Sequence, residues 1–210
     1  RLYEGVELGT EGAVGLITYM RTDSTRLSQD AVQAARAYLA VTWPEPYLPA
    51  RPVFYKAKAG AQDAHEAIRP TDVNRTPEKL TPYLNKEQLK LYTLIWKRFV
   101  ASQMAPALIA QKSVDIAAGD YLFRAAGSTV EFPGFMVLYE ESSEDAEGAK
   151  DGEARLPDLQ QGQSLALQEL RARQHFTQPP PRYSEASLIK ELEERGIGRP
   201  STYATILSTI

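Results

Sequence analysis

Apolar residues recur at helical spacing in the first half of the chain and again near its end. Ser28, a favourable N-cap residue, precedes a helix that the pattern predicts over residues 28–42. Asn85 and Gln88 form a capping-box pattern at the start of a second helix, which ends before Met104. One apolar stripe follows this second helix, and it consists of Leu89, Tyr92, Trp96, Phe99 and Val100.

The pattern changes to short β-type runs in the middle of the chain. Residues 111–139 are rich in β-branched and aromatic residues broken by two Gly-containing turns, which predicts antiparallel strands. Residues 15–20 favour a further short strand, and residues 164–173 alternate like another. The sequence therefore predicts a mixed α and β fold.

The end of the chain returns to helical spacing. A proline tract at residues 178–181 predicts a stiff spacer and a boundary. Ser184 is placed to cap a helix that Gly196 ends, and Pro200 suits the first residue of a last helix. Two helices joined by a glycine turn resemble a helix-turn-helix.

Composition narrows the class of protein. With 210 residues and 43% apolar content, the chain can form an ordinary globular core. It has no cysteine and only His65 and His175, so we expect no disulfide and no metal site. No apolar run or secretion signal indicates a membrane partner, and we expect a cytoplasmic protein. Because the chain begins at Arg1 and ends at Ile210 within a helical pattern, we expect a piece of a longer protein.

The net charge of −3 argues against a polyanionic partner only at first sight. Residues 140–158 hold eight acidic and two basic residues and have almost no large apolar side chain, which predicts a solvated loop. This loop carries −6, so the other residues carry +3. A mildly basic body is compatible with DNA but does not identify it.

Residues 18–24 concentrate a phenol, a guanidinium, a carboxylate and several hydroxyls. In a strand, Tyr19 and Arg21 would point to the same face. A phenol of pKa about 10 is a poor nucleophile at neutral pH. Arg21 could lower that pKa, grip a phosphate through two hydrogen bonds and offset transition-state charge. The alternative is a half-buried core tyrosine beside a solvated arginine.

Two further clusters could contact phosphate. In a helical turn, His65 and Arg69 would share one face; the alternative is a surface turn with a Glu66 to Arg69 ion pair. At residues 195–203, two arginines, two hydroxyls and a helix N-terminus could form a phosphate cradle. There the alternative is a glycine-capped helix with solvated arginines.

Together the segments GLITYMRTDS, AHEAIRPT and RYSEASLIKELEERGIGRPSTYATILSTI resemble, in this order, signature segments of the bacterial type IA DNA topoisomerases. The resemblance runs from Gly15 to Ile210 and is weakest at residues 107–178. Met20 is more similar to the topoisomerase I version of the first segment than to the Pro-containing version of topoisomerase III.

The resemblance implies that Tyr19 attacks single-stranded DNA and forms a 5′-phosphotyrosine. Passage of the other strand and resealing would then relax negatively supercoiled DNA without ATP, in the bacterial cytoplasm at the nucleoid. Arg21 would contact the scissile phosphate, and His65 and Arg69 would bind DNA near it. The remaining candidates, as supports or DNA-backbone contacts, are Thr18, Asp23, Arg199, Ser201 and Thr202.

The family fold is a ring of domains around a hole for duplex DNA. It maps here onto an α-rich tyrosine domain at residues 1–105, a β-rich arch segment at 106–176 and the start of a helical DNA-binding domain at 177–210. The family's Mg²⁺-binding acidic domain precedes the tyrosine domain and is absent from this sequence. The resemblance therefore implies a Mg²⁺ cofactor held outside these 210 residues, which would be inactive alone.

Two other functions remain open. A tyrosine recombinase or type IB topoisomerase also gathers arginines, a histidine and a tyrosine around a phosphate, but its tyrosine normally follows the basic residues and would form a 3′-phosphotyrosine. A noncatalytic DNA-binding module would use only the last two helices. That reading leaves residues 18–24 unexplained.

Overall fold

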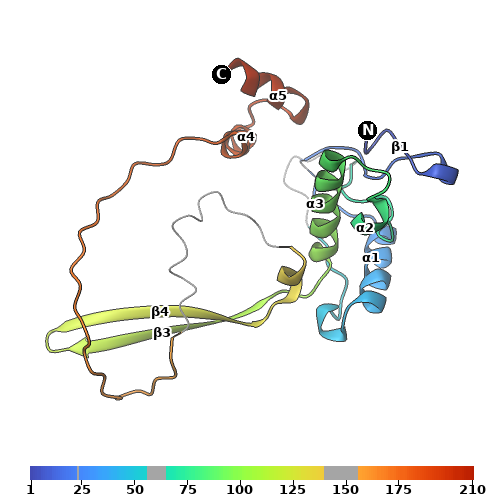
Figure 1. Ribbon diagram of the computed structural model, residues 1–210. Coiled ribbons are helices and arrows are strands. Elements are labelled where there is room, and N and C mark those ends of the chain that lie inside the picture. Colours follow the sequence, from blue (N-terminus) through green and yellow to red (C-terminus); the bar gives the residue numbers. More distant parts are fainter. Residues whose placement is uncertain (23, 56–64, 140–155) are drawn as a thin grey trace. The chain divides into compact units, whose positions relative to one another are not determined.

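The computed structural model describes residues 1–22, 24–55, 65–139 and 156–210 and has the predicted mixture of helices and strands (Figure 1). It divides into two compact units, Arg1–Pro157 and Asp158–Ile210. The division at 105/106 and 176/177 stays a prediction. In chain order the elements are β1 (Val6–Glu7), β2 (Ala13–Val14), α1 (Gln29–Thr42), α2 (Pro77–Leu80), α3 (Lys86–Ser102), β3 (Leu108–Ala118), β4 (Tyr121–Phe132), α4 (Glu185–Glu194) and α5 (Pro200–Thr209).

Local capping starts the two long helices of the first unit, as predicted. The backbone N–H of Ala31 donates to the Ser28 hydroxyl at 3.3 Å, and α1 begins at the next residue after Ser28. Asn85 and Gln88 complete a reciprocal capping box, with bonds of 2.9 and 3.1 Å, before α3. These bonds satisfy N–H groups that a helix start leaves without an intrahelical partner.

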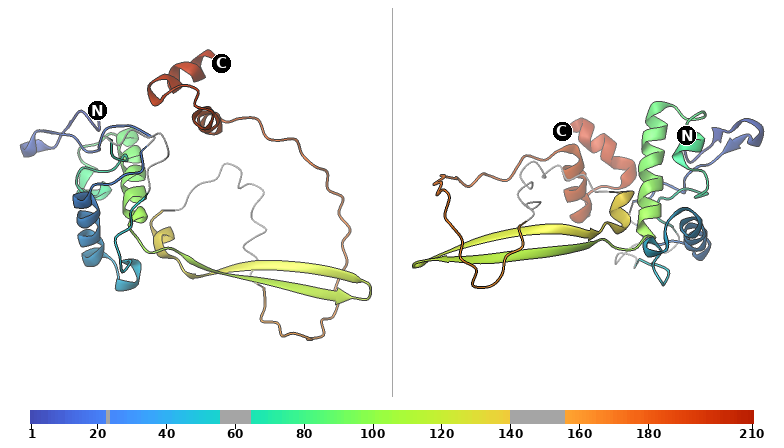
Figure 2. Two further views of the ribbon diagram at one scale, coloured as in Figure 1. Left: turned by 180° about the vertical axis from the view of Figure 1, so that it is seen from behind. Right: turned by 60° about the horizontal axis from the view of Figure 1, so that its bottom comes forward.

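The core lies between α1 and α3, which run side by side in Figures 1 and 2. The rings of Tyr38 and Trp96 meet edge to face at 5.6 Å between the two helices. Trp96 and Tyr92 are buried, and each donates its polar hydrogen to a backbone carbonyl, at 2.9 and 2.6 Å. This burial therefore leaves no polar atom of either ring unpaired. The rest of the core is aliphatic or aromatic, chiefly Leu16, Ile17, Val32, Leu39, Phe99 and Val100.

An antiparallel hairpin of β3 and β4 confirms the predicted strands in the middle of the chain. Gly119, at φ +61°, makes the turn, and the pairing runs in register from Ala118 and Tyr121 to Ile109 and Val130. Both views in Figure 2 show the hairpin as a two-stranded ribbon. Its base packs against the rest of the first unit, where the Phe132 ring lies 4.9 Å from that of Tyr47.

The expectation of β structure up to residue 139 is wrong. Residues Gly134–Val137 form a 3₁₀ turn instead. Gly134 has φ +50°, and a Cβ there would lie 2.5 Å from the backbone of Ala105 and Pro106. The chain bends at this contact, where the Phe135 N–H donates to the Ala105 carbonyl at 2.9 Å, and the strand ends.

Two other predicted strands are also wrong. Residues 15–20 contain one β-bridge, between Ile17 and Pro70, and the adjacent Arg69 N–H donates to the Thr18 hydroxyl instead of continuing a ladder. Residues 164–173 form neither helix nor strand, and Leu167 and Leu170 are exposed. In the described ranges no strand pairs with this run, so alternation alone does not produce a sheet.

The second unit has the two predicted helices, α4 and α5. Ser184 caps α4 through a bond from the Ser187 N–H, and Pro200 is the first residue of α5. Between the helices Gly196 and Gly198 have φ +69° and +77°, a conformation that favours glycine. Among the residues with a defined position in either unit, no helix is both long and apolar enough to cross a membrane.

Candidate active site

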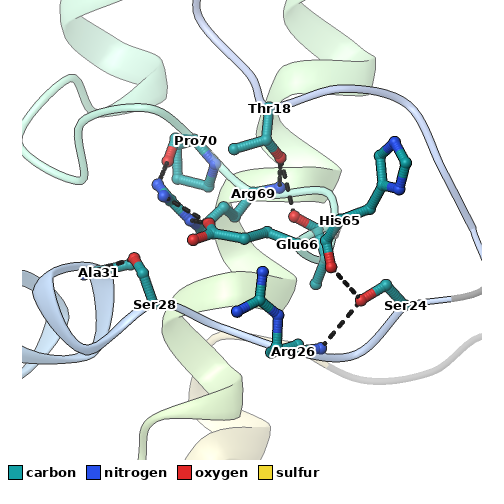
Figure 3. Close-up of polar contacts among 10 residues, drawn as sticks. Thr18, Ser24, Arg26, Ser28, Ala31, His65, Glu66, Arg69 and Pro70 are labelled. Atoms are coloured by element: carbon teal, nitrogen blue, oxygen red, sulfur yellow. Dashed lines mark hydrogen bonds and ion pairs between the residues drawn. The ribbon is translucent and has the colours of Figure 1, made fainter. Parts of the chain in front are cut away.

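Tyr19 lies in the extended link between β2 and α1, and this link is bonded to residues 65–71 rather than to a sheet. The Thr18 N–H donates to the Arg69 carbonyl at 2.9 Å, and the Thr18 hydroxyl accepts from the Arg69 N–H at 3.0 Å. The same hydroxyl donates to the Ala67 carbonyl at 2.8 Å (Figure 3). Thr18 therefore fixes the backbone immediately before Tyr19.

A second set of bonds fixes the link beyond Tyr19. The Ser24 hydroxyl donates to the His65 carbonyl at 2.7 Å and accepts from the Arg26 N–H at 3.3 Å (Figure 3). The Ala67 N–H donates to the Arg26 carbonyl at 2.8 Å. Ser24 is buried, so this contact is shielded from competing water.

The Tyr19 side chain is 52% exposed, although its backbone is held on both sides. Its ring lies edge-on to the ring of Tyr3, with centroids 5.5 Å apart and an interplanar angle of 72°. The His65 ring lies on another side at 5.6 Å and 36°. The phenol thus belongs to a partly exposed aromatic cluster and is not one of the fully buried core residues.

Arg21 is partly buried, and its N–H donates to the Tyr19 carbonyl at 2.9 Å, which closes a tight turn. The expectation that alternation in a strand aligns Tyr19 with Arg21 is therefore wrong, because no strand is present here. Asp23, the other charged candidate of this segment, lies outside the described residues.

The predicted helical turn at His65 to Arg69 is also wrong, because the segment is irregular. The Arg69 guanidinium donates to a Glu66 carboxylate oxygen from Nε at 2.8 Å and lies 2.7 Å from it through Nη2. It also donates to the Pro70 carbonyl at 3.0 Å. The ion pair named as the alternative is present, but both side chains are mostly buried, at 15% and 22% exposure. A DNA contact of Arg69 stays a prediction.

The His65 ring points away from the Glu66–Arg69 pair (Figure 3). Its centroid lies 5.6 Å from that of the Tyr19 ring. Its Nδ1 is buried and makes no hydrogen bond within the part of the chain that the structure describes. A buried imidazole nitrogen without a partner is uncommon in folded proteins.

A groove with a volume of about 680 Å³ begins at Arg21 and follows one face of α3. Its floor includes the exposed Leu91 and Leu94, and Arg98 on its wall lies 5.2 Å from the centre of the Tyr139 ring. Tyr55 also lines the groove, and its hydroxyl donates to the Ser102 carbonyl at 2.7 Å. Burial raises the pKa of Tyr55, opposed by the charge of Arg98, which favours the protonated phenol that donates this bond.

The third cluster lies in the second unit, at the start of α5. The Arg199 N–H donates to the Thr202 hydroxyl at 2.8 Å, and that hydroxyl donates to the Arg199 carbonyl at 3.0 Å. The Arg199 guanidinium donates to the Gly198 carbonyl at 2.8 Å. Ser201 and Thr202 are exposed at the first turn. Thr202 thus caps the helix, and its predicted phosphate contact stays a prediction.

Sequence reasoning missed Tyr3 and Ser24, which contact the candidate residues directly. Tyr3 is 16 residues before Tyr19, and no periodic pattern connects them. The only local signal was Gly15, whose Cβ would lie 2.7 Å from the Tyr3 carbonyl oxygen. Such a close backbone approach requires glycine, but the sequence alone does not name the partner.

No group of three or more His, Cys, Asp or Glu side chains that could hold a metal ion occurs within the described ranges. The two described side chains that meet the Tyr19 ring, Tyr3 and His65, carry no carboxylate. They do not fit a divalent cation, which prefers oxygen ligands from carboxylates and carbonyls.

The chain matches one class of protein, the DNA topoisomerases, whose family model matches residues 1–210. The chain belongs to this DNA topoisomerase family. It is 52% identical over 213 aligned residues to the DNA topoisomerase 1 of Xylella fastidiosa strain Temecula1, and equally so to that of strain 9a5c. The match covers 100% of this chain and 26% of each relative, so the chain spans about a quarter of their length.

A solved structure gives the same assignment. The full-length topoisomerase I from Thermotoga maritima superposes with a TM-score of 0.77 at 38% identity. The match covers 99% of this chain and 32% of that one. The similarity to topoisomerase I confirms both the resemblance of the three signature segments and the mixed fold class.

Proposed function

We propose that this chain supplies the nucleophile of a type IA DNA topoisomerase. Tyr19 would cleave one strand of DNA, the other strand would pass through the break, and resealing would relax negative supercoils. One observation chiefly supports this proposal: in a member of the DNA topoisomerase family, the phenol of Tyr19 is exposed while its backbone and ring are held in place.

In the proposed reaction the Tyr19 oxygen forms a bond to phosphorus, and the bond from phosphorus to the 3′-oxygen breaks. The phenol loses its proton, and the departing 3′-oxygen gains one. The product is a 5′-phosphotyrosine and a free 3′-hydroxyl. Because one phosphodiester replaces another, the reverse step reseals DNA without ATP.

Basic groups near Tyr19 would stabilise the phosphate. Arg21, two residues after Tyr19, would donate two parallel hydrogen bonds to it and offset the charge that develops on its oxygens. His65, whose Nδ1 has no described partner, would contact DNA beside the phenol. The Glu66–Arg69 pair would hold the segment that carries His65. Contacts from Arg199, Ser201 and Thr202 would add affinity that falls as salt rises.

A Mg²⁺ ion belongs to this proposal as a cofactor held elsewhere in the complete protein. No step above passes through the ion, because the described residues do not fit a metal site. The isolated 210 residues are accordingly expected not to relax DNA. Reproducible Mg²⁺-dependent relaxation by this chain alone would contradict that expectation. The substrate would be single-stranded or negatively supercoiled DNA, at the nucleoid in a bacterial cytoplasm.

The test is a Tyr19→Phe substitution in the complete protein that contains this chain. We expect no covalent adduct with single-stranded DNA and no relaxation, with the DNA affinity retained. Tyr83→Phe is the matched control, since Tyr83 is an exposed tyrosine of the same unit away from the site, and it should react like the wild type. If Tyr19→Phe retains full activity, Tyr19 is not the nucleophile, and a noncatalytic DNA-binding role is favoured for this chain.

A further inference from the structure

The Tyr19 ring has two aromatic neighbours among the described residues, and the proposed mechanism uses only one of them. His65 has a predicted role in DNA binding, whereas Tyr3 has none. Tyr3 meets the Tyr19 ring edge-on at 5.5 Å, a geometry in which the positive edge of one ring faces the negative face of the other. The contact therefore favours one orientation of the phenol over others.

Tyr3 can act as a support because its own backbone is fixed. The adjacent Leu2 is buried, and its carbonyl accepts from the N–H groups of Leu16 and Ile17 at 2.7 and 3.3 Å. The Tyr3 carbonyl lies so close to Gly15 that a Cβ there would be 2.7 Å from its oxygen. These contacts attach Tyr3 to the residues just before Tyr19.

Tyr19 needs such a support because its own segment has no regular secondary structure and its side chain is half exposed. A free tyrosine side chain would distribute among staggered χ1 rotamers. Attack on phosphorus requires the phenol oxygen in one position, opposite the leaving oxygen, and each competing rotamer lowers the reactive fraction.

We propose that Tyr3 is a positioning residue, whose ring holds the phenol of Tyr19 in the orientation that attacks the phosphodiester. This inference rests on the proposed function of Tyr19 and extends it to a residue without a catalytic group of its own. The ring of Tyr3 carries the effect, and its hydroxyl does not. The role differs from stacking of Tyr3 on a DNA base, which would contribute to affinity.

The experiment compares Tyr3→Leu and Tyr3→Phe in the complete protein, with Tyr83→Leu as the matched control at an exposed tyrosine of the same unit. Single-turnover cleavage of an end-labelled single-stranded oligonucleotide gives the rate constant, and equilibrium binding of the same oligonucleotide gives the affinity. The free energy of an edge-to-face ring pair corresponds to a change of about tenfold in a rate constant. Tyr3→Leu should therefore slow cleavage by about that factor. The Kd of Tyr3→Leu for the oligonucleotide should stay unchanged. Tyr3→Phe and Tyr83→Leu should cleave like the wild type.

Two results would overturn the inference. The first is an unchanged cleavage rate of Tyr3→Leu at saturating DNA, and a weaker Kd of that variant would then make Tyr3 a DNA contact. The second is an equal loss of the cleavage rate in Tyr3→Phe. If Tyr3→Leu does not fold, Gly15→Ala replaces it, because the new Cβ displaces the Tyr3 carbonyl and should also slow cleavage without weakening binding.

The comparison also separates this inference from the function on which it rests. If the wild-type protein forms no adduct, the proposed function of Tyr19 fails. If the wild-type protein forms the adduct and Tyr3→Leu forms it equally fast, only the positioning role of Tyr3 fails.

Discussion

The hydroxyl of Thr18 accepts a hydrogen bond from the backbone N–H of Arg69 at 3.0 Å, across 51 positions of sequence. Since the same hydroxyl donates to the Ala67 carbonyl, one small side chain connects the tyrosine segment to the segment that carries His65. The relative position of the Tyr19 and His65 rings depends on this connection.

Replacing Thr18 with valine removes both bonds but keeps the shape of the side chain. The Arg69 N–H and the Ala67 carbonyl would lose a partner in a partly buried site, which costs about 1–3 kcal/mol of folding free energy. We expect a lower melting temperature of the complete protein and slower DNA cleavage. Thr18→Ser keeps the hydroxyl and should restore most of both; a Thr18→Val protein equal to the wild type in both measurements would show that the hydroxyl has no such role.

Replacing Arg69 with methionine should lower stability more than DNA affinity. The change leaves the mostly buried Glu66 carboxylate without its partner, at a cost of about 1–3 kcal/mol. The double variant Glu66→Gln, Arg69→Met removes that charge as well and should recover part of the loss in a thermal unfolding experiment.

The single variant Arg69→Met also tests the predicted DNA contact of Arg69. Because the guanidinium already donates to Glu66 and Pro70, we expect the salt dependence of DNA binding to keep its slope. A phosphate contact of Arg69 would instead reduce the slope of log K against log salt by about one. That reduction would show that Arg69 exchanges its intrachain partners for DNA.

Tyr92 gives the fold a dependence on alkaline pH. Burial, with a smaller contribution from Asp72, raises the pKa of Tyr92 above its ordinary value. Because the pKa of this phenol is higher in the folded state, unfolded Tyr92 loses its proton at a lower pH than folded Tyr92. The free energy of unfolding therefore stays constant below about pH 10 and falls as the pH rises above that value. Unfolding midpoints measured from pH 8 to 11 should fall at the upper end. Tyr92→Phe should weaken this fall, whereas Tyr83→Phe, at an exposed position, should leave it unchanged.

Local chemistry explains which elements could be predicted from the sequence. Ser28, Asn85 and Ser184 bond to N–H groups only three residues away, so each helix start is visible in a short segment. Gly119 similarly marks the hairpin turn through its own backbone conformation. The residues of the three signature segments were similar enough to those of the topoisomerase family to identify it from the sequence.

Contacts between distant segments explain what could not be predicted. The Tyr3–Tyr19 and Ser24–His65 contacts join residues that no periodicity relates. The run at residues 164–173 has the alternation of a strand, but a strand needs a partner that alternation does not supply. The strand predicted at residues 15–20 is wrong because the Arg69 N–H donates to the Thr18 hydroxyl where a ladder bond would continue.

The most direct test of the central claim determines which end of the DNA becomes attached to Tyr19. The complete protein would be incubated with end-labelled single-stranded DNA and Mg²⁺, the adduct trapped by denaturation, and the linked peptide and DNA end identified. The proposed function predicts a 5′-phosphate on Tyr19. A 3′-phosphate on that tyrosine would contradict the account and place the chemistry with the tyrosine recombinases and type IB enzymes, and an adduct on any other residue would remove Tyr19 from the reaction.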